Sequence, residues 1–184
     1  YPLHSAYPKI LDEFTCDNHE FIIIEDRGKS LKELIFEKGK FSVSLSVQII
    51  QQIAEAVHVA HQKNIILRDL SPNNILLNGK QVTLIDLEYS YRPDGPPLSS
   101  IGTPGFSLKE QMNPRITPEI PSATNDIYSI GAIWHTLLSP DSYIKFITQK
   151  MDKSKAWERS DLPKECPDEI RRIIERCLCK NGYR

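Results

Sequence analysis

The sequence predicts an α+β fold that is mostly α-helical, and three observations support this prediction. Two short apolar runs flank a polar turn near the start of the chain. Two further short apolar runs flank an Asn78-Gly79 pair, which is the pattern of a β-hairpin. Beyond residue 118, apolar residues recur at helical spacing. Strands followed by a series of helices are typical of α+β domains.

The elements of the first part of the chain can be assigned in order. Residues 10–24 read as two strands around a polar turn, and a short connector over residues 25–29 follows. Ser30 is the candidate N-cap of a helix that Gly39 ends. A long helix is expected over residues 41–63, because isoleucine, valine and alanine recur there at three- and four-residue intervals.

The remaining elements are a hairpin, a long loop and further helices. Residues 75–85 read as the hairpin closed by Asn-Gly. Residues 88–118 are rich in proline and polar side chains, and connections of that length in compact domains are usually functional or mobile. A strongly apolar helix is expected over residues 125–138, and the last helix over about residues 167–179.

Composition narrows the class of protein. The 184 residues suffice for one domain or a large part of one, with 40% hydrophobic and 26% charged residues. Because 23 basic residues balance 24 acidic ones, we expect neither nucleic acid nor a membrane surface as a partner. No apolar run is long enough to span a bilayer. The four cysteines form no C-x-x-C pair, so we expect free thiols and a cytoplasmic location.

The segment from Leu67 to Asn74, followed by Asp86, carries the residue types needed for phosphoryl transfer to a hydroxyl. Asp69 could accept the hydroxyl proton, while Asn74 and Asp86 are hard oxygen ligands able to hold magnesium against a triphosphate. Each also has a purely structural interpretation, as a turn aspartate, an Asx-turn asparagine and a strand-end cap. The motifs that flank them favour the functional interpretation.

These motifs resemble those of the eukaryotic-type protein kinases. Arg68-Asp69 with Asn74 is similar to the catalytic loop, and Asp86 to the aspartate of the D-F-G element. Gly102-Thr103-Pro104-Gly105-Phe106 resembles the substrate-positioning end of the activation segment, and residues 126–131 resemble the D-x-W-S-x-G element. Because several motifs occur in the right order with the right gaps, nearly the whole chain resembles the C-terminal lobe of a kinase.

The resemblance implies a division of the chain. Residues 1–25 would be the last two strands of the small lobe, residues 26–29 the hinge, and residues 30–184 the large lobe. Within the large lobe, residues 67–74 would form the catalytic loop and residues 86–110 the activation segment.

The resemblance also implies roles for individual side chains. Asp69 would act as the base, with Mg2+ (or Mn2+) and ATP or GTP held by Asn74 and Asp86. Thr103 and Ser71 are grouped with the catalytic residues, although Ser71 stands where serine/threonine kinases usually have a lysine. Arg68 could bind a phosphorylated residue of the activation segment, or could equally be a surface arginine.

Two further groups of residues follow from the same resemblance. The nucleotide would be contacted by backbone groups of Glu25, Asp26 and Arg27 and by the side chains of Leu76 and Ile85. The residues with structural roles would be Glu110 and Arg184, as an ion pair, and Asp126, as an acceptor of backbone hydrogen bonds from the catalytic loop.

Departures from the usual kinase motifs indicate a branch of the family. Leu67 replaces histidine, Ser71 replaces lysine, and Glu88 replaces the glycine of D-F-G. Together with G-T-P-G-F, these residues resemble the kinase domain of class III and class IV lanthipeptide synthetases. That resemblance implies phosphorylation of Ser and Thr in a precursor peptide, with lyase and cyclase domains in the same polypeptide.

Other interpretations remain open. The chain could belong to a free-standing bacterial Ser/Thr kinase, or to a pseudokinase that binds a peptide or nucleotide without turnover. A small-molecule kinase of the choline or aminoglycoside type fits Asp86-Leu87-Glu88 but leaves residues 102–106 and 126–131 unexplained. No glycine-rich loop or V-A-I-K lysine precedes the hinge. We therefore expect the chain to be a piece of a longer polypeptide and to be inactive alone.

Overall fold

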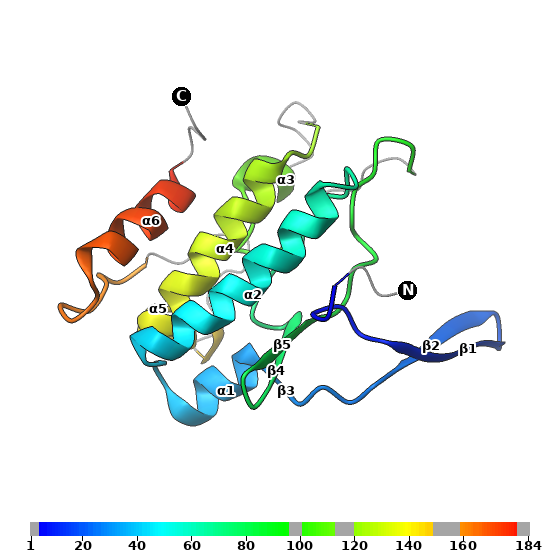
Figure 1. Cartoon of the computed structure of the whole chain (residues 1–184), viewed down its shortest axis with the longest axis horizontal. Coiled ribbons are helices and arrows are strands. Elements are labelled where there is room, and N and C mark those ends of the chain that lie inside the picture. Colours follow the sequence, from blue (N-terminus) through cyan, green and yellow to red (C-terminus); the bar gives the residue numbers. More distant parts are fainter. Residues whose placement is uncertain (1–3, 96–100, 113–119, 149–158, 180–184) are drawn as a thin grey trace.

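The computed structural model describes residues 4–95, 101–112, 120–148 and 159–179. The fold is α+β and mostly helical, which confirms the predicted class (Figure 1). In chain order the elements are β1 (Ile10–Cys16), β2 (His19–Ile24), β3 (Lys29–Ser30), α1 (Leu31–Lys38), α2 (Val43–His61), β4 (Ile75–Asn78), β5 (Gln81–Leu84), α3 (Lys109–Met112), α4 (Ala123–Leu138), α5 (Asp141–Thr148) and α6 (Asp168–Leu178). Among the helices in these segments, none is long and apolar enough to cross a membrane.

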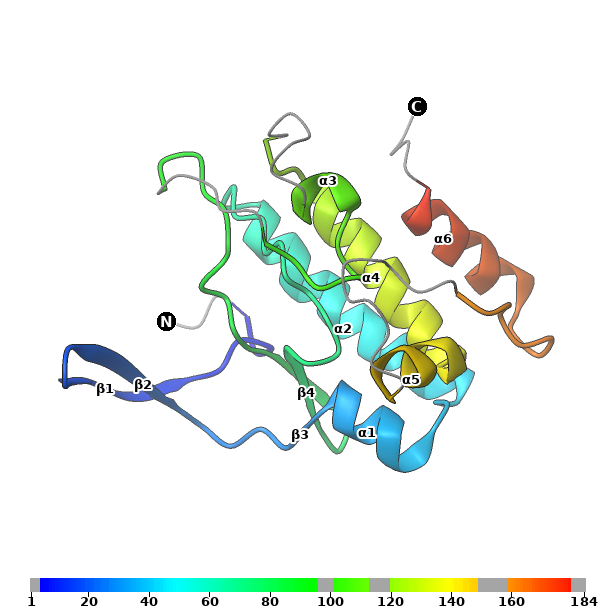
Figure 2. The same ribbon diagram turned by 180° about the vertical axis from the view of Figure 1, so that it is seen from behind.

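Helices α2 and α4 lie side by side at the centre of the molecule (Figures 1 and 2). Helix α2 contributes a stripe of fully buried side chains that includes Ile49 and Ile53, and most of the second half of α4 is buried. Each large aliphatic side chain removed from water in this way contributes about 1.5–3 kcal/mol. Between the helices, the buried indole N–H of Trp134 donates to Ser46 Oγ at 3.1 Å. This buried donor therefore has a hydrogen-bond partner.

Helix α6 packs on α4 at a glycine. A Cβ added at Gly131 would lie 2.5 Å from Cys177 Cβ on α6. Real Cβ atoms do not approach this closely, so the side-chain-free position allows the two helices to meet. The glycine of the motif over residues 126–131 therefore has a packing role in this fold.

The N-terminal strands form an antiparallel hairpin that projects away from the helices (Figures 1 and 2). Asp17 and Asn18 both have positive φ, at 49° and 63°, as a two-residue type I′ turn requires. Phe14 and Phe21 are paired across the strands and stack at 5.1 Å between ring centroids. The predicted strand pair is confirmed, but all of β1 is exposed.

The second sheet contains a strand that the sequence did not predict. Strands β4 and β5 form the predicted hairpin, with Gly79 at φ 61° in its turn. The connector also pairs with β4, as β3, through Lys29 opposite Leu77. Gly28 makes this pairing possible, because its φ is 87° and a Cβ there would lie 2.7 Å from the Leu77 carbonyl oxygen. A two-residue strand has too short a pattern to read from the sequence alone.

The ends of the helices follow their capping residues. Ser30 caps α1 and forms a capping box with Glu33, and Gly39 ends the helix, as predicted. Helix α2 begins two residues later than expected, because the Ser42 side chain accepts a hydrogen bond from the Leu45 N–H and so acts as its N-cap. Helix α4 begins two residues earlier than expected, after Ser122.

Candidate active site

The hairpin of β4 and β5 brings the predicted metal ligands to one end of the sheet. Asn74 immediately precedes β4, and Asp86 follows β5 by two residues. Because the strands are antiparallel, these two positions lie at the same end of the hairpin. The Ile85 N–H donates to the Asn74 carbonyl at 2.9 Å, which ties the two segments together.

Asp69 is held by donors on both of its carboxylate oxygens. The Thr103 hydroxyl donates to Asp69 Oδ1 at 2.7 Å. Asn74 Nδ2 donates to Asp69 Oδ2 at 3.1 Å and to the Asp69 carbonyl at 2.9 Å. The structure therefore brings together two residues predicted to be catalytic, Asp69 and Thr103, and the predicted metal ligand Asn74, although Thr103 lies 34 positions from Asp69 in the chain.

Asp126 fixes the start of the catalytic loop. This carboxylate is fully buried at the first turn of α4. It accepts hydrogen bonds from the Leu67 N–H at 2.9 Å and the Arg68 N–H at 2.8 Å. Its Oδ2 also lies 2.8 Å from His61 Nε2, at the end of α2. A buried carboxylate needs such partners, and these partners hold the loop between the two central helices.

Arg68 is directed inward. Its side chain is 5% exposed, and Nη1 donates to the Tyr89 carbonyl at 3.4 Å. Burial lowers the pKa of the guanidinium, and the charges of Asp126 and Asp69 oppose that shift. The side chain thus points toward the segment that follows Asp86, and the alternative of a surface arginine is excluded by its burial.

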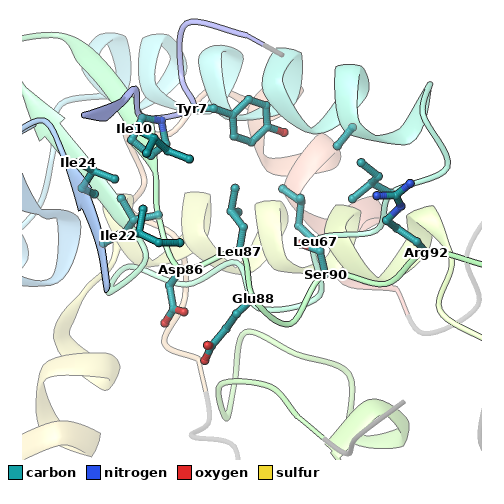
Figure 3. Close-up of a pocket in the computed structure, with 14 residues that line it drawn as sticks. Tyr7, Ile10, Ile22, Ile24, Leu67, Asp86, Leu87, Glu88, Ser90 and Arg92 are labelled. Carbon is teal, nitrogen blue, oxygen red and sulfur yellow. The ribbon is translucent and has the colours of Figure 1, made fainter. Parts of the chain in front are cut away.

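Asp86 lies in an environment that favours a cation. Burial, followed by the negative charges of Glu88 and Asp69, raises the pKa of its carboxyl group. In Figure 3 the side chains of Asp86 and Glu88 extend to the same side of the chain. In the described part of the chain, no three His, Cys, Asp or Glu side chains form a metal cluster. Magnesium bound through phosphates needs only one or two protein ligands, so the donor set of Asn74 and Asp86 fits that ion.

Ser71 is fully buried, and its hydroxyl has no hydrogen-bond partner among the described residues. Its backbone carbonyl accepts the Asn74 N–H at 3.0 Å, within the turn that shapes the catalytic loop. The buried hydroxyl is therefore not exposed to solvent at the site. Its place among the catalytic residues stays a prediction.

The predicted nucleotide contacts lie on the connector between β2 and β3, on β4 and directly after β5. Glu25 and Arg27 form an ion pair at 2.5 Å, and Asp26 Oδ1 accepts the Gly28 N–H at 2.9 Å. These residues connect β2 to β3. Leu76 lies in β4 and is partly buried, and Ile85 lines a cavity that Asp86 also lines. The assignment of all five residues to the nucleotide stays a prediction.

That cavity was not predicted from the sequence. It has a volume of about 660 Å³ and lies between the β1–β2 hairpin and the segment that follows β5 (Figure 3). Its lining is mostly apolar and includes Ile22, Leu67 and Leu87. The Tyr7 hydroxyl at its edge donates to the Ala56 carbonyl at 2.8 Å, and burial raises the pKa of Tyr7 to about 12. Ile85 and Asp86 in its lining were predicted site residues, but no periodic pattern marks the residues before β1, so the sequence offered no signal that Tyr7 would also line this cavity.

The predicted pair of Glu110 and Arg184 lies partly outside the described residues, because Arg184 is among those that the structure does not describe. Glu110 lies in α3 and is partly exposed. A different arginine contacts the predicted activation segment. Arg159 donates to the Gly105 carbonyl and to the Tyr128 hydroxyl, and its guanidinium lies 5.6 Å from the centre of the Tyr128 ring. No motif in the sequence singled out Arg159.

Comparison with known proteins identifies the family. Residues 4–184 match the family model of the protein kinase domain. This chain belongs to the protein kinase domain family. The match covers nearly the whole chain, which agrees with the order of motifs and with the helical fold.

Relatives of this kinase domain occur in distant organisms. A protein of Caenorhabditis briggsae named as the probable serine/threonine-protein kinase zyg-1 is 26% identical over 144 residues, which cover 74% of this chain and 20% of that protein. Myosin light chain kinase 3 of Rattus norvegicus is 33% identical over 143 residues, covering 74% of this chain and 18% of that protein. A probable serine/threonine-protein kinase of Clostridium perfringens is 26% identical over 184 residues, covering 94% of this chain and 26% of that protein. This kinase domain therefore spans at most about a quarter of the length of these three relatives.

Proposed function

We propose that this kinase domain transfers the terminal phosphoryl group of a nucleoside triphosphate to serine or threonine hydroxyls of a peptide. The observation that carries this proposal is the Asp69 carboxylate, held at 2.7 Å by the Thr103 hydroxyl and at 3.1 Å by Asn74. Oriented carboxylates of this kind suit proton transfer from a hydroxyl. The names of the three relatives, which are all kinases, support the same reaction class.

In the proposed reaction, Asp69 orients the substrate hydroxyl and accepts its proton. The hydroxyl oxygen forms a bond to the terminal phosphorus, the bond from that phosphorus to the bridging oxygen breaks, and the electron pair leaves with the nucleoside diphosphate. Each carboxylate oxygen has two lone pairs, so Asp69 can accept the substrate proton while it keeps the donors from Thr103 and Asn74. These two donors prevent the carboxylate from rotating away from the substrate.

Asn74 and Asp86 would hold magnesium, with manganese as an alternative. When bound, the metal ion supplies positive charge that neutralises the phosphate oxygens. The two negative neighbours of Asp86, which raise its pKa, support this assignment, because a cation relieves their repulsion. We further propose that the nucleotide is contacted by backbone groups of Glu25, Asp26 and Arg27 and by Leu76 and Ile85; the pairing of β3, which follows this connector, with β4 supports this assignment.

We further propose that the peptide is the precursor of a lanthipeptide. In support, the segment from Asp69 to Asn74, the pair Asp86 and Glu88, and residues 102–106 resemble the kinase domain of lanthipeptide synthetases. Lyase and cyclase domains of the same polypeptide would then eliminate the phosphate and close the rings. A cytoplasmic location fits this proposal, and it is supported by four cysteines that are all free.

The test compares the intact protein that contains this chain with an Asp69→Asn variant. Each is incubated with magnesium, ATP or GTP, and the peptide encoded beside its gene, and the peptide mass is measured. Phosphorylation adds about 80 daltons per group, and subsequent elimination leaves the peptide about 18 daltons lighter than at the start. Asparagine keeps the shape of Asp69 but is a poor base, so we expect a rate lower by about 10²–10⁴-fold.

Asp12→Asn provides the matched control. Asp12 lies on exposed β1 and accepts the Glu13 N–H at 2.9 Å, which an asparagine oxygen can also do. We expect its rate to equal that of the unmodified protein. Phosphorylation of unrelated protein substrates, but not of the precursor peptide, would contradict the lanthipeptide assignment and leave the kinase assignment in place. An unchanged mass with every substrate, combined with intact nucleotide binding, would contradict both and favour a pseudokinase.

A further inference from the structure

We propose that Gln111, held by Asn125, is a positioning residue for phosphoryl transfer. Its amide fixes the catalytic loop against the activation segment, so that the Thr103 hydroxyl meets Asp69. This inference rests on the proposed kinase function and deepens it. It concerns side chains that none of the motifs identified from the sequence includes.

The Gln111 side chain bridges the two segments that meet at the site. Its Nε2 donates to the Arg68 carbonyl at 2.7 Å and to the Ile101 carbonyl at 2.8 Å. Arg68 directly precedes Asp69, and Ile101 lies two residues before Thr103. The single amide group therefore uses both of its N–H donors to join the backbone on either side of the Thr103–Asp69 contact.

Asn125 fixes the direction of that amide. Its Nδ2 donates to Gln111 Oε1 at 2.9 Å, while its Oδ1 accepts the Ser122 N–H at 2.9 Å as part of the cap of α4. With the Asn125 N–H donor on one side and two carbonyl acceptors on the other, only one orientation of the Gln111 amide satisfies every partner. Helix α4, which is mostly buried, thereby anchors Gln111.

The backbone at Arg68 needs this support. Its φ is 69°, in the left-handed region, which is strained for a residue with a long side chain such as arginine. Asp126 accepts its N–H at 2.8 Å, and Gln111 donates to its carbonyl at 2.7 Å. Both backbone polar groups of the strained residue are thus held from neighbouring positions of α4, one directly through Asp126 and one through Asn125 and Gln111.

The activation segment also packs closely on Gln111. A Cβ added at Gly102 would lie 3.1 Å from Gln111 Nε2 and 2.5 Å from Ser107 Oγ. Ser107 Oγ in turn accepts the Thr103 N–H at 3.0 Å. Gln111 and Ser107 therefore fix the residues before and at Thr103, and only glycine fits between them. Moving the Gln111 amide would move the Thr103 hydroxyl relative to Asp69.

The test measures steady-state kinetics of Gln111→Met in the intact protein. Methionine is similar in size but donates no hydrogen bond, so the two carbonyls lose their bridge. We expect kcat to fall by about 10–100-fold with the nucleotide KM unchanged, because small displacements of reacting groups have effects of this order. In a Thr103→Val background the further loss caused by Gln111→Met should shrink to about twofold or less, since the contact it positions is already gone.

Two other variants serve as a matched control and as a second test of the same side chain. Gln51→Met makes the same change at an exposed site on α2, where the amide donates to Glu55 at 3.0 Å, and kcat should not change. Gln111→Asn keeps the amide but is one methylene shorter, so it cannot span both carbonyls. It should reproduce the loss of kcat even if Gln111→Met fails to fold.

A second measurement does not depend on activity. Hydrogen–deuterium exchange over residues 101–107 should become faster in Gln111→Met and Gln111→Asn but not in Gln51→Met. The inference is overturned if exchange there is unchanged, or if kcat falls by the same factor with and without Thr103. Both results leave the kinase assignment intact provided that the unmodified protein phosphorylates its peptide. If it does not, the kinase assignment fails, and the exchange measurement alone decides whether Gln111 positions the segment.

Discussion

Backbone strain at single residues marks the candidate site. Five described residues other than glycine have positive φ: Asp17, Asn18, Asn64, Arg68 and Asp86. Aspartate and asparagine tolerate this conformation, so Arg68 is the exception. A strained residue persists only where its surroundings hold it, and Arg68 is held at its N–H by Asp126 and at its carbonyl by Gln111. Both contacts lie beside the proposed base.

At the scale of single residues, His135 should make the free energy of unfolding depend on pH. Burial, and then the charge of Arg159, lowers the pKa of this histidine from 6.5 to about 4. The unfolded chain therefore binds the proton first as the pH falls, so the folded state loses stability between about pH 6.5 and pH 4. Over this whole range the loss corresponds to about 3 kcal/mol of unfolding free energy.

The measurement is urea unfolding of the unmodified protein and His135→Gln at pH 7, 5.5 and 4.5. Glutamine does not titrate, so the difference between the two proteins isolates the histidine from the carboxyl groups. The unmodified protein should lose stability relative to the variant as the pH falls. A difference in unfolding free energy that stays constant over this range would show that His135 can be protonated in the folded state.

At the scale of elements, the contact between α4 and α6 depends on Gly131. Gly131→Ala would gain about 1 kcal/mol in helix propensity. The new Cβ would lie 2.5 Å from Cys177 Cβ, however, and overpacking of this kind costs about 1–3 kcal/mol. We expect net destabilisation, observed as a lower urea midpoint with an unchanged slope.

A double-mutant cycle provides the control for this prediction. Cys177→Gly removes the atom that the new methyl group would strike, at the expense of a glycine in α6. The double variant should be less destabilised than the sum of the two single variants. If the two effects simply add, the helices separate to admit the methyl group, and the close approach is not required by the fold.

Whether an element could be predicted from the sequence depends on whether local residues or distant contacts determine it. Helices α2 and α4 and the β4–β5 hairpin follow from periodicity and turn residues, which are local. Strand β3 was missed, because the pairing of Lys29 with Leu77 depends on a contact 48 residues away. In the same way, Asp69, Asn74 and Asp86 lie close together in the chain, on either side of one hairpin, so their spacing could be recognised from the sequence. The Gln111 bridge arises only when three distant segments meet.

At the scale of the whole molecule, stability is distributed unevenly. Buried side chains are concentrated where α2 and α4 meet, whereas β1 is exposed along its length and β2 in all but its last residue. The hairpin carries large exposed apolar side chains, with Phe14 at 48% and Ile22 at 61% exposure. An isolated two-stranded hairpin is marginally stable in water.

We therefore expect the hairpin and the helical core to open separately. Amides of β1 and β2 should exchange with deuterium through local opening, and amides of α2 and α4 only through global unfolding. Phe14→Ala removes the stacked pair with Phe21 and should speed exchange in the hairpin while leaving the urea midpoint of the core unchanged. Ile53→Ala, at a fully buried position of α2, should lower the global unfolding free energy by about 2–5 kcal/mol. A midpoint that falls equally in both variants would contradict this division, because it would mean that the hairpin and the helices unfold as one cooperative unit.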